Sequence, residues 1–367
     1  MAVAADVERG WSPNWAVHPG EHLEEHLESR GLSQADFARL SALSPKLVST
    51  IIAGKNPVTP ETALRLERVL GVRAYIWAGL QAKWDIHQAR LNEEAVADPK
   101  DWLKRFPIRE LKERKLLPAT TDSSVLLDEV LKLFGIGRIS AYEAKVGALA
   151  VHHRQSRAYA TSEDHIATWL LIGEAKAREM RLPEFDVRRF NQAVSEIRSL
   201  TTEPPEQFEP RMRALCRAAG VALILEKPLS KTCLFGSARW LDGNRAIIQM
   251  SLRMKTNDHF WWTFFHEAAH VVLHRGRSFV DDKAGEADDV EIEADAWANN
   301  TLFGRVGLDR LLEERPRSAV SVARLANEFG LHPGIIVGAL QHHGALPYTH
   351  LNAMKARFIW ADETTER

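Results

Sequence analysis

Hydrophobic positions recur at helical spacing along most of the chain, whereas short apolar runs typical of strands occur in one region only. From His18 to about Asp85 the helical patterns are punctuated by glycine and proline, which predicts an all-α domain. Further helices are predicted in the middle of the chain, for example over 126–134 and 162–181.

The pattern changes after Pro204, where strands join the helices. A helix over 212–219 leads to an apolar run over 221–226, which predicts a strand. Segments 237–241 and 246–251 flank an Asp-Gly-Asn turn and predict a hairpin. The remaining predicted elements are helices over 258–274 and 290–303, and two more between 321 and 343 that are separated at 330–333.

The composition is that of an ordinary soluble protein, with 45% hydrophobic and 26% charged residues. A formal net charge of -1 means that any nucleic-acid binding must come from a local basic surface. The two cysteines are too few for a disulfide framework and suit a reducing compartment. The sequence shows neither a signal peptide nor a run of about 20 apolar residues, so a cytoplasmic location without membrane association is expected.

Two successive helices near the N-terminus have distinctive turn and capping chemistry. Ser33 is predicted to cap the first helix and Ser44 the second, in which Pro45 takes the first position because its missing N–H costs nothing there. Val48 and Ile51 are three residues apart and should therefore pack inward on one face. The polar side chains between them point outward, as in a recognition helix that enters the major groove of DNA.

This region is locally basic, because three basic residues and no acidic residue lie between Asp36 and Glu61. Such a face suits contacts with DNA phosphates, which position a module on the double helix. The residues predicted to contact DNA are Gln34, Arg39, Pro45, Lys46, Ser49, Thr50 and Lys55. An ordinary helical hairpin is the alternative, and both the turn chemistry and the charge pattern disfavour it.

Over about residues 15–90 the chain resembles the HigA-type antitoxin branch of the Cro/C1 (XRE) helix-turn-helix family. The resemblance rests on HPGE at 18–21, GLSQ at 31–34 and ALRL at 63–66, followed by Trp77 and Leu80-Gln81. It implies sequence-specific binding to a double-stranded DNA operator as a homodimer. It also implies autoregulation of a toxin–antitoxin or similar operon, with a toxin as the protein partner.

The helix predicted over 258–274 carries the pentapeptide HEAAH at 266–270. The i,i+4 spacing puts His266 and His270 on one face, where both imidazoles can reach one tetrahedral Zn²⁺. Glu267 lies beside them and can accept a proton from water whose pKa the metal lowers to about 7. Two surface histidines are the alternative, but the apolar flanks predict a buried helix, in which the histidines need polar partners.

A third ligand is expected from the following helix, in which Glu291 and Asp295 share a face at i,i+4 spacing, as in the gluzincin layout. We predict Glu291 as the ligand and Asp295 as the residue that holds a histidine Nδ1–H. Glu293 is the alternative ligand. His274 lies well round the helix from His266 and is interpreted as a polar or rim residue. His/His/Glu ligation favours zinc, although Mn²⁺ or Fe²⁺ would also accept it.

The stretch over 220–303 resembles the ImmA/IrrE metallopeptidase family. The resemblance rests on FFHEAAH at 264–270 and on the pattern ExEADxWA at 291–298. It implies a zincin-like domain that cleaves a repressor or partner protein under a stress signal. Two departures bear on substrate choice and not on the ligands: DAWA at 295–298 stands where the family often has Asn-x-Phe-Ala, and Gly304 replaces the usual proline.

The predicted function is therefore a DNA-binding transcriptional regulator with a zinc-dependent endopeptidase domain, which hydrolyses a peptide bond in a repressor, in itself or in a partner. The alternative is a non-catalytic HigA-like antitoxin that represses its operon and binds a toxin, with a structural or metal-sensing second domain. No oxyanion-stabilising residue is identifiable, and the candidates by residue type alone are His332, His342, His343 and Tyr348.

The predicted fold class is mainly α with a small β-sheet, comprising an all-α helix-turn-helix domain, a helical middle region and an α+β zincin-like metallopeptidase domain. The middle region carries no chemical motif and is interpreted as a spacer or dimerisation element. The predicted boundaries are a flexible tail over 1–14, the XRE-type DNA-binding domain over 15–90, the linker and helical middle region over 91–204, the zincin-like domain over 205–350, and a C-terminal helix and tail over 351–367.

Overall fold

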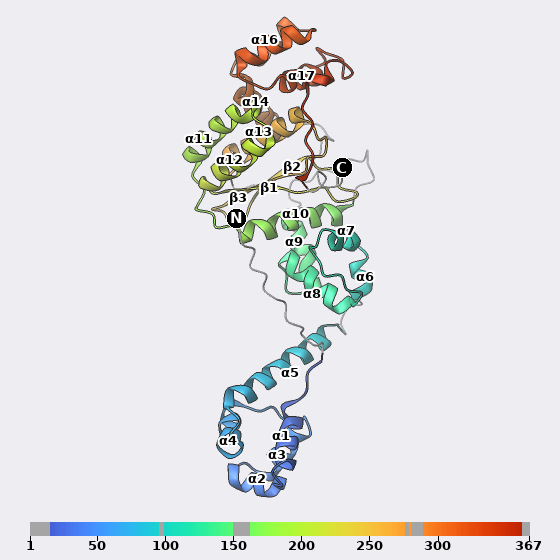
Figure 1. Cartoon of the computed structure of the whole chain (residues 1–367), viewed down its shortest axis with the longest axis vertical. Helices are drawn as coiled ribbons and strands as arrows, with labels where there is room; N and C mark the ends of the chain where they lie inside the picture. The colour runs from blue at the N-terminus through green and yellow to red at the C-terminus, as the bar shows by residue number, and fades with distance from the viewer. Residues whose placement is uncertain (1–14, 95–98, 150–161, 276–278, 281–288, 362–367) are drawn as a thin grey trace. The chain divides into compact units, whose positions relative to one another are not determined.

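The computed structural model describes residues 15–94, 99–149, 162–275, 279–280 and 289–361. The chain divides into two compact units, 1–102 and 103–367, each of which is described by itself (Figure 1). The tail predicted at 1–14, and residues 362–367 of the C-terminal helix and tail predicted over 351–367, lie outside the described residues. Among the helices that are described, none has the length and hydropathy needed to span a bilayer.

The first unit consists of short helices joined by tight turns. They are α1 (Pro19–Glu28), α2 (Gln34–Ser41), α3 (Pro45–Ile52), α4 (Pro60–Leu70) and the longer α5 (Ala74–Glu94). The first four each begin at a side chain that accepts a backbone N–H of the first turn, namely His18, Ser33, Ser44 and Thr59. The predicted caps Ser33 and Ser44 are confirmed, as is Pro45 at the first position of α3.

Helices α1 and α3 approach each other closely at Gly20. A Cβ atom at this position would lie 1.9 Å from the carbonyl oxygen of Ile51, so only glycine fits. The two helices pack on a core that contains Leu23, Phe37 and Val48. Ile51 and Val48 point into this core, as their spacing predicted.

The second unit contains a four-stranded sheet with the strand order β1-β3-β2-β4. Its strands are β1 (Val221–Leu225), β2 (Gly236–Trp240), β3 (Ala246–Met250) and the short β4 (Phe279–Val280). Strands β2 and β3 form the predicted antiparallel hairpin. Strand β1 also agrees with the prediction, but it pairs parallel to β3, with Val221 opposite Ala246.

Helices cover both faces of this sheet (Figure 1). On one face lies α10 (Glu163–Glu179), which contacts β1 and β3. On the other face lie α12 (Pro205–Ala218) against β1 and α13 (Asn257–Leu273) against β2 and β3. Helix α13 is also covered by α14 (Asp289–Phe303) and α17 (Pro333–His342), which leaves it buried almost all round.

Residues 103–204, which lie within the linker and helical middle region predicted over 91–204, belong to the second compact unit. Helix α10 covers the sheet, and α11 (Val187–Ser199) contributes Phe190 and Ile197 to the same core as α13. The other elements before the sheet are α6 (Pro99–Leu103), α7 (Ile108–Glu113), α8 (Ser123–Phe134), η1 (Ile139–Ala141), α9 (Tyr142–Leu149) and η2 (Leu200–Thr202). The sequence missed this packing because tertiary partners leave no local motif.

The end of the chain was predicted as a C-terminal helix and tail over 351–367. After α15 (Gly307–Glu314), α16 (Ala319–Phe329) and α17, the described part of this stretch includes the 3-10 turn η3 (Asn352–Met354). The segment after η3 is extended, and Arg357 forms an antiparallel bridge with Thr256 at the start of α13. This extended segment forms backbone hydrogen bonds with the residues at the start of α13 and just before it.

Candidate metal centre and helix-turn-helix surface

Helix α13 carries His266 and His270 one turn apart in the interior of the second unit. Each is only 2% exposed, because the sheet, α14 and α17 cover the helix. A buried imidazole needs partners for both ring nitrogens, since an unpaired polar atom in the interior is costly. The contacts of these nitrogens therefore show what the site is built to hold.

Glu291, in the first turn of α14, brings a carboxylate to the two imidazoles. The Nε2 atoms of His266 and His270 lie 3.1 Å apart. His266 Nε2 is 3.1 Å from Glu291 Oε2, and His270 Nε2 is 3.5 Å from Glu291 Oε1. One potential ligand atom from each of the three residues lies within 4.8 Å of the others, and they are the one such group among the described residues.

These separations fit a tetrahedral metal ion. With Zn–N and Zn–O bonds of about 2.0–2.2 Å, two ligand atoms of a tetrahedral site lie about 3.3–3.5 Å apart. Two imidazole nitrogens and one carboxylate oxygen are the donor set of a three-ligand zinc site that keeps a fourth position open. The residues present therefore fit the ion that the sequence predicts.

The second ring nitrogen of His266 is held by the predicted residue, Asp295. His266 Nδ1 donates to Asp295 Oδ1 at 2.9 Å, which leaves the lone pair of Nε2 directed at the candidate metal position. Trp262 stacks on the same imidazole, with ring centroids 4.9 Å apart, and restricts its rotation further. Because Glu291 and Asp295 are four residues apart on α14, both side chains reach the same histidine, His266.

His270 is held by a relay that the sequence did not predict. Its Nδ1 lies 3.1 Å from His274 Nδ1, and His274 Nε2 lies 3.1 Å from Glu293 Oε2. Because the Glu293 carboxylate accepts from His274 Nε2, His274 Nδ1 can accept in turn from His270 Nδ1. His270 Nε2 is then left with its lone pair, as a metal ligand requires.

This relay explains the positions of His274 and Glu293. The sequence predicts His274 as a polar or rim residue and Glu293 as the alternative ligand. His274 lies one helical turn after His270, contacts its Nδ1 atom, and is buried. Glu293, the alternative ligand, contacts His274 and not the candidate metal position. The signal available in the sequence was the i,i+4 repeat from His270 to His274, which predicts a contact between neighbouring side chains.

The electrostatics favour the ligating forms of these groups. Burial lowers the pKa of His270, so its neutral form dominates near pH 7. Burial alone raises the pKa of Glu291, but the imidazoles of His266 and His270 beside the carboxylate outweigh burial and hold the pKa far below its usual range. Neutral imidazole and ionised carboxylate are the forms that bind divalent ions.

Glu267 is fully buried between α13 and the start of β2. A Cβ atom on Gly236, the first residue of β2, would lie 2.5 Å from Glu267 Oε1. Glycine at this position leaves room for the carboxylate, which the α13 backbone places next to His266.

The candidates for an oxyanion stabiliser do not gather at this centre. His332 caps α17, where its Nδ1 accepts from Gly334 N, and it also contacts Asn257. His342, His343 and Tyr348 line a separate cavity beside Trp262. The residue types alone did not predict which of these four side chains caps a helix and which line a cavity.

In the first unit, most of the predicted DNA contacts lie on the surface. Gln34, Arg39, Pro45, Lys46, Ser49 and Lys55 are exposed, and Thr50 is partly buried. The Thr50 hydroxyl donates to the backbone carbonyls of Lys46 and Leu47. Arg39 pairs with Asp36 at 2.7 Å, so its charge is partly compensated. Lys46 and Ser49 therefore form the free polar face of the first turns of α3.

Comparison with known proteins matches this unit. A helix-turn-helix family model matches residues 23–77. Virulence-associated protein I of Dichelobacter nodosus is 35% identical over 82 residues, which is 22% of this chain and 76% of that protein. The uncharacterized HTH-type transcriptional regulator YddM of Escherichia coli (strain K12) is 34% identical over 71 residues, 19% of this chain and 76% of that protein.

Two solved structures are also similar to the chain. An antidote protein of a plasmid maintenance system from Nostoc punctiforme is 29% identical, with a TM-score of 0.22, and the match covers 22% of this chain and 88% of that one. An addiction module antidote protein of the HigA family from Coxiella burnetii is 34% identical, with a TM-score of 0.20, covering 22% of this chain and 86% of that one.

The capped helix pair and its exposed polar face define the first unit as a helix-turn-helix domain, a class that places its second helix in the major groove of DNA. Through this domain the chain belongs to the helix-turn-helix family, of XRE type.

Proposed function

We propose that this protein is a transcriptional regulator whose second unit is a zinc-dependent endopeptidase. The observation that carries the enzymatic part is the convergence of His266, His270 and Glu291 on one position, with Glu267 buried beside them. A protein substrate fits this site better than a small one, because the regulator shares its chain with a DNA-binding domain. The substrate is a repressor, this chain itself, or a partner such as a toxin.

Zinc held by these residues supplies Lewis acidity and lowers the pKa of water. The chain supplies the rest of the chemistry. Asp295 and the pair His274–Glu293 hold the two imidazoles in the tautomers that bind a metal. Glu267 takes a proton from the attacking water and returns it to the amine that leaves, as a general base and then a general acid. Gly236, which has no side chain, leaves room for this carboxylate on the strand side.

The first unit supports the regulatory part of the proposal. Helix α3 would enter the major groove of an operator, with Lys46 and Ser49 facing the DNA and with Lys46, Arg39 and Lys55 near the phosphates. XRE-type domains read palindromic half-sites as dimers, so we infer that the chain acts as a homodimer.

The decisive experiment pairs metal analysis with the Glu267→Gln variant. Purified wild type should hold about one zinc per chain and cleave a protein encoded beside its own gene. Glu267→Gln should retain the zinc and the fold but lose cleavage by at least about a hundredfold, the usual contribution of a general base. Glu313→Gln, an exposed change on α15, serves as the control. Equal cleavage by the two variants would remove Glu267 from the chemistry.

A competing candidate is a non-catalytic antitoxin with a structural or metal-sensing second unit. It is favoured by one observation: the family model matches residues 23–77 and stops short of the metal centre. Under this alternative, wild type and Glu267→Gln behave alike on every neighbouring gene product, and only removal of zinc by a chelator alters operator binding. Gel shifts with and without chelator separate a sensor from an enzyme.

A further inference from the structure

A cavity of about 390 Å³ lies beside the candidate metal centre and has no role in the chemistry described so far. Its floor is made of apolar residues from α14 and α17, among them Leu302, Phe303 and Ile335. Exposed His342, His343 and Tyr348 form its rim. A volume of this size lies within the range of about 300–1,000 Å³ that is typical of ligand pockets.

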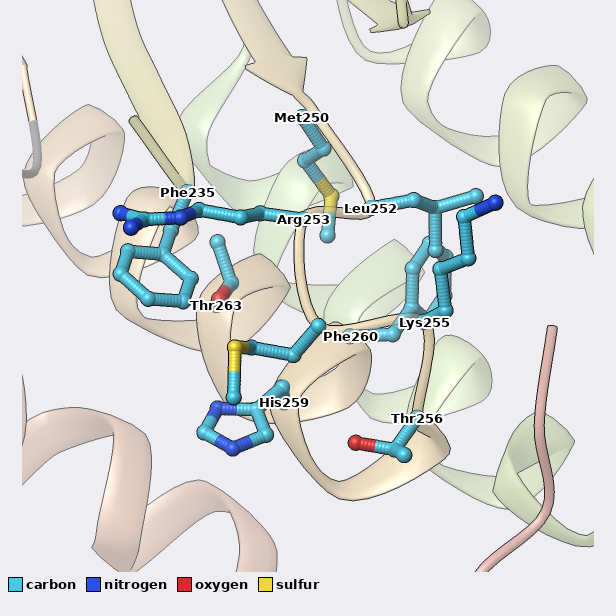
Figure 2. Close-up of a pocket in the computed structure, with 10 residues that line it drawn as sticks. Phe235, Met250, Leu252, Arg253, Lys255, Thr256, His259, Phe260 and Thr263 are labelled. Atoms are coloured by element: carbon cyan, nitrogen blue, oxygen red, sulfur yellow. The ribbon is translucent and has the colours of Figure 1, made fainter. Parts of the chain in front are cut away.

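Two walls connect the cavity to the metal centre. One is Trp262, which lines the cavity and stacks on the ligand His266 with centroids 4.9 Å apart. The other is Phe235, which precedes Gly236, the residue that packs against Glu267. Figure 2 shows Phe235 and His259, which also line a smaller neighbouring cavity, where their rings stack with centroids 6.1 Å apart.

Trp262 both lines the cavity and stacks on His266, so a single side chain separates the cavity from the candidate metal position. An extended peptide advances about 3.3–3.6 Å per residue, so a substrate held at the metal position would place a neighbouring side chain close to this wall.

The charges in the wall favour an apolar occupant. Asp258 and Lys355 both line the cavity, but their side chains pair at 2.6 Å. Lys355 also donates to Gln341 Oε1 at 2.7 Å, so its ammonium group is used within the wall. An incoming charged side chain would have to break this pair and lose its hydration, whereas an apolar one gains by leaving water.

We propose that this cavity binds a large apolar side chain of the protein substrate, aromatic or leucine-sized, next to the peptide bond that is cleaved. The inference rests on the proposed endopeptidase function and names the substrate class at its site. Ala339 of α17 lines the cavity and is half-buried, so a larger side chain there would occupy the space that the substrate needs.

The test compares two probes, N-acetyl-phenylalanine amide and N-acetyl-alanine amide, on the zinc-loaded full chain by ligand-observed NMR. Wild type should bind the phenylalanine probe at least about tenfold more tightly, the usual value of several buried methylenes. Ala339→Phe should reduce the difference to about twofold while keeping its zinc. Ala323→Phe, a half-buried change on α16 away from the cavity, should preserve it. Ala339→Leu is the milder filling if Ala339→Phe folds poorly.

Equal binding of the two probes by wild type, or an unchanged preference in the folded Ala339 variants, would overturn the proposal. A peptide library incubated with wild type gives the second readout. Cleavage without enrichment of large apolar residues beside the cut overturns the cavity proposal and leaves the endopeptidase intact. Absence of any cleavage, with zinc bound, overturns the proposed function and the substrate role of the cavity together.

Discussion

The helix-turn-helix surface and the candidate metal centre are built in opposite ways. Most of the residues predicted to contact DNA are exposed on two consecutive short helices whose shape depends on local caps, Ser33 and Ser44. The histidines of the metal centre are buried, and their carboxylate partner comes from a different helix. The helix-turn-helix surface is formed by one continuous segment of the chain. The candidate metal centre is assembled from helices that the fold of the second unit brings together.

This difference decides what a substitution can do. On an exposed face, each side chain contributes separately, and water compensates for its loss. In the candidate metal centre, the ring nitrogens of the two histidines contact other side chains, so one loss leaves a partner without its contact in the interior. We therefore expect large, all-or-none effects at the metal centre and small, graded effects on the DNA-binding face.

The largest effect is expected from His266→Ala. Removing one of three ligands should reduce zinc from about one equivalent to a trace, because the remaining pair leaves two positions to water. Inductively coupled plasma mass spectrometry of the purified variant measures the loss. His343→Ala, an exposed histidine outside the ligand set, is the control and should retain full metal. Stoichiometric zinc in His266→Ala would show that the ion binds elsewhere.

Gly20→Ala tests a position in the first unit where two helices are in close contact. The new methyl group would meet the Ile51 carbonyl, so we expect a loss of about 2–3 kcal/mol in the free energy of unfolding of this unit. Gly79→Ala in α5 meets nothing within 4 Å and should stabilise by up to about 1 kcal/mol. Urea denaturation followed by circular dichroism compares them. Similar stabilities for the two variants would contradict the close approach of α1 and α3.

Asp295→Asn should weaken zinc binding without abolishing it. The change removes the charge that fixes the His266 tautomer but leaves all three ligands, and losses of about tenfold are usual for such orienting residues. Competition with a fluorescent chelator gives the affinity. The exposed Asp309→Asn on α15 is the matched control. An affinity equal to that of wild type would show that the carboxylate does not orient the imidazole.

The smallest effect is expected on the DNA-binding face. Lys46→Ala should weaken binding to a mixed-sequence duplex about threefold to tenfold and lower the salt dependence by about one phosphate contact. Arg39→Ala should do less, because Asp36 already pairs with that guanidinium. Fluorescence anisotropy across a salt series measures both. A larger loss in Arg39→Ala than in Lys46→Ala would reverse this assignment of the face.

What the sequence predicted well was whatever depends on neighbours along the chain. The caps Ser33 and Ser44, the hairpin after Trp240 and the helices that carry His266 and Glu291 all appear where the patterns put them. The reason is that capping, turn formation and i,i+4 spacing are set within a few residues. The pentapeptide HEAAH therefore predicts two imidazoles on one face without any knowledge of the fold.

What only the tertiary structure decided was which side chain meets which partner from another element. Glu291 and Glu293 are two residues apart, and the packing of α14 on α13 brings one to the imidazoles and the other to His274. The parallel pairing of β1, the position of α10 on the sheet and the cavity beside Trp262 depend equally on such packing. Contacts between distant segments follow from how apolar faces are buried together, and the sequence of either segment alone does not contain that information.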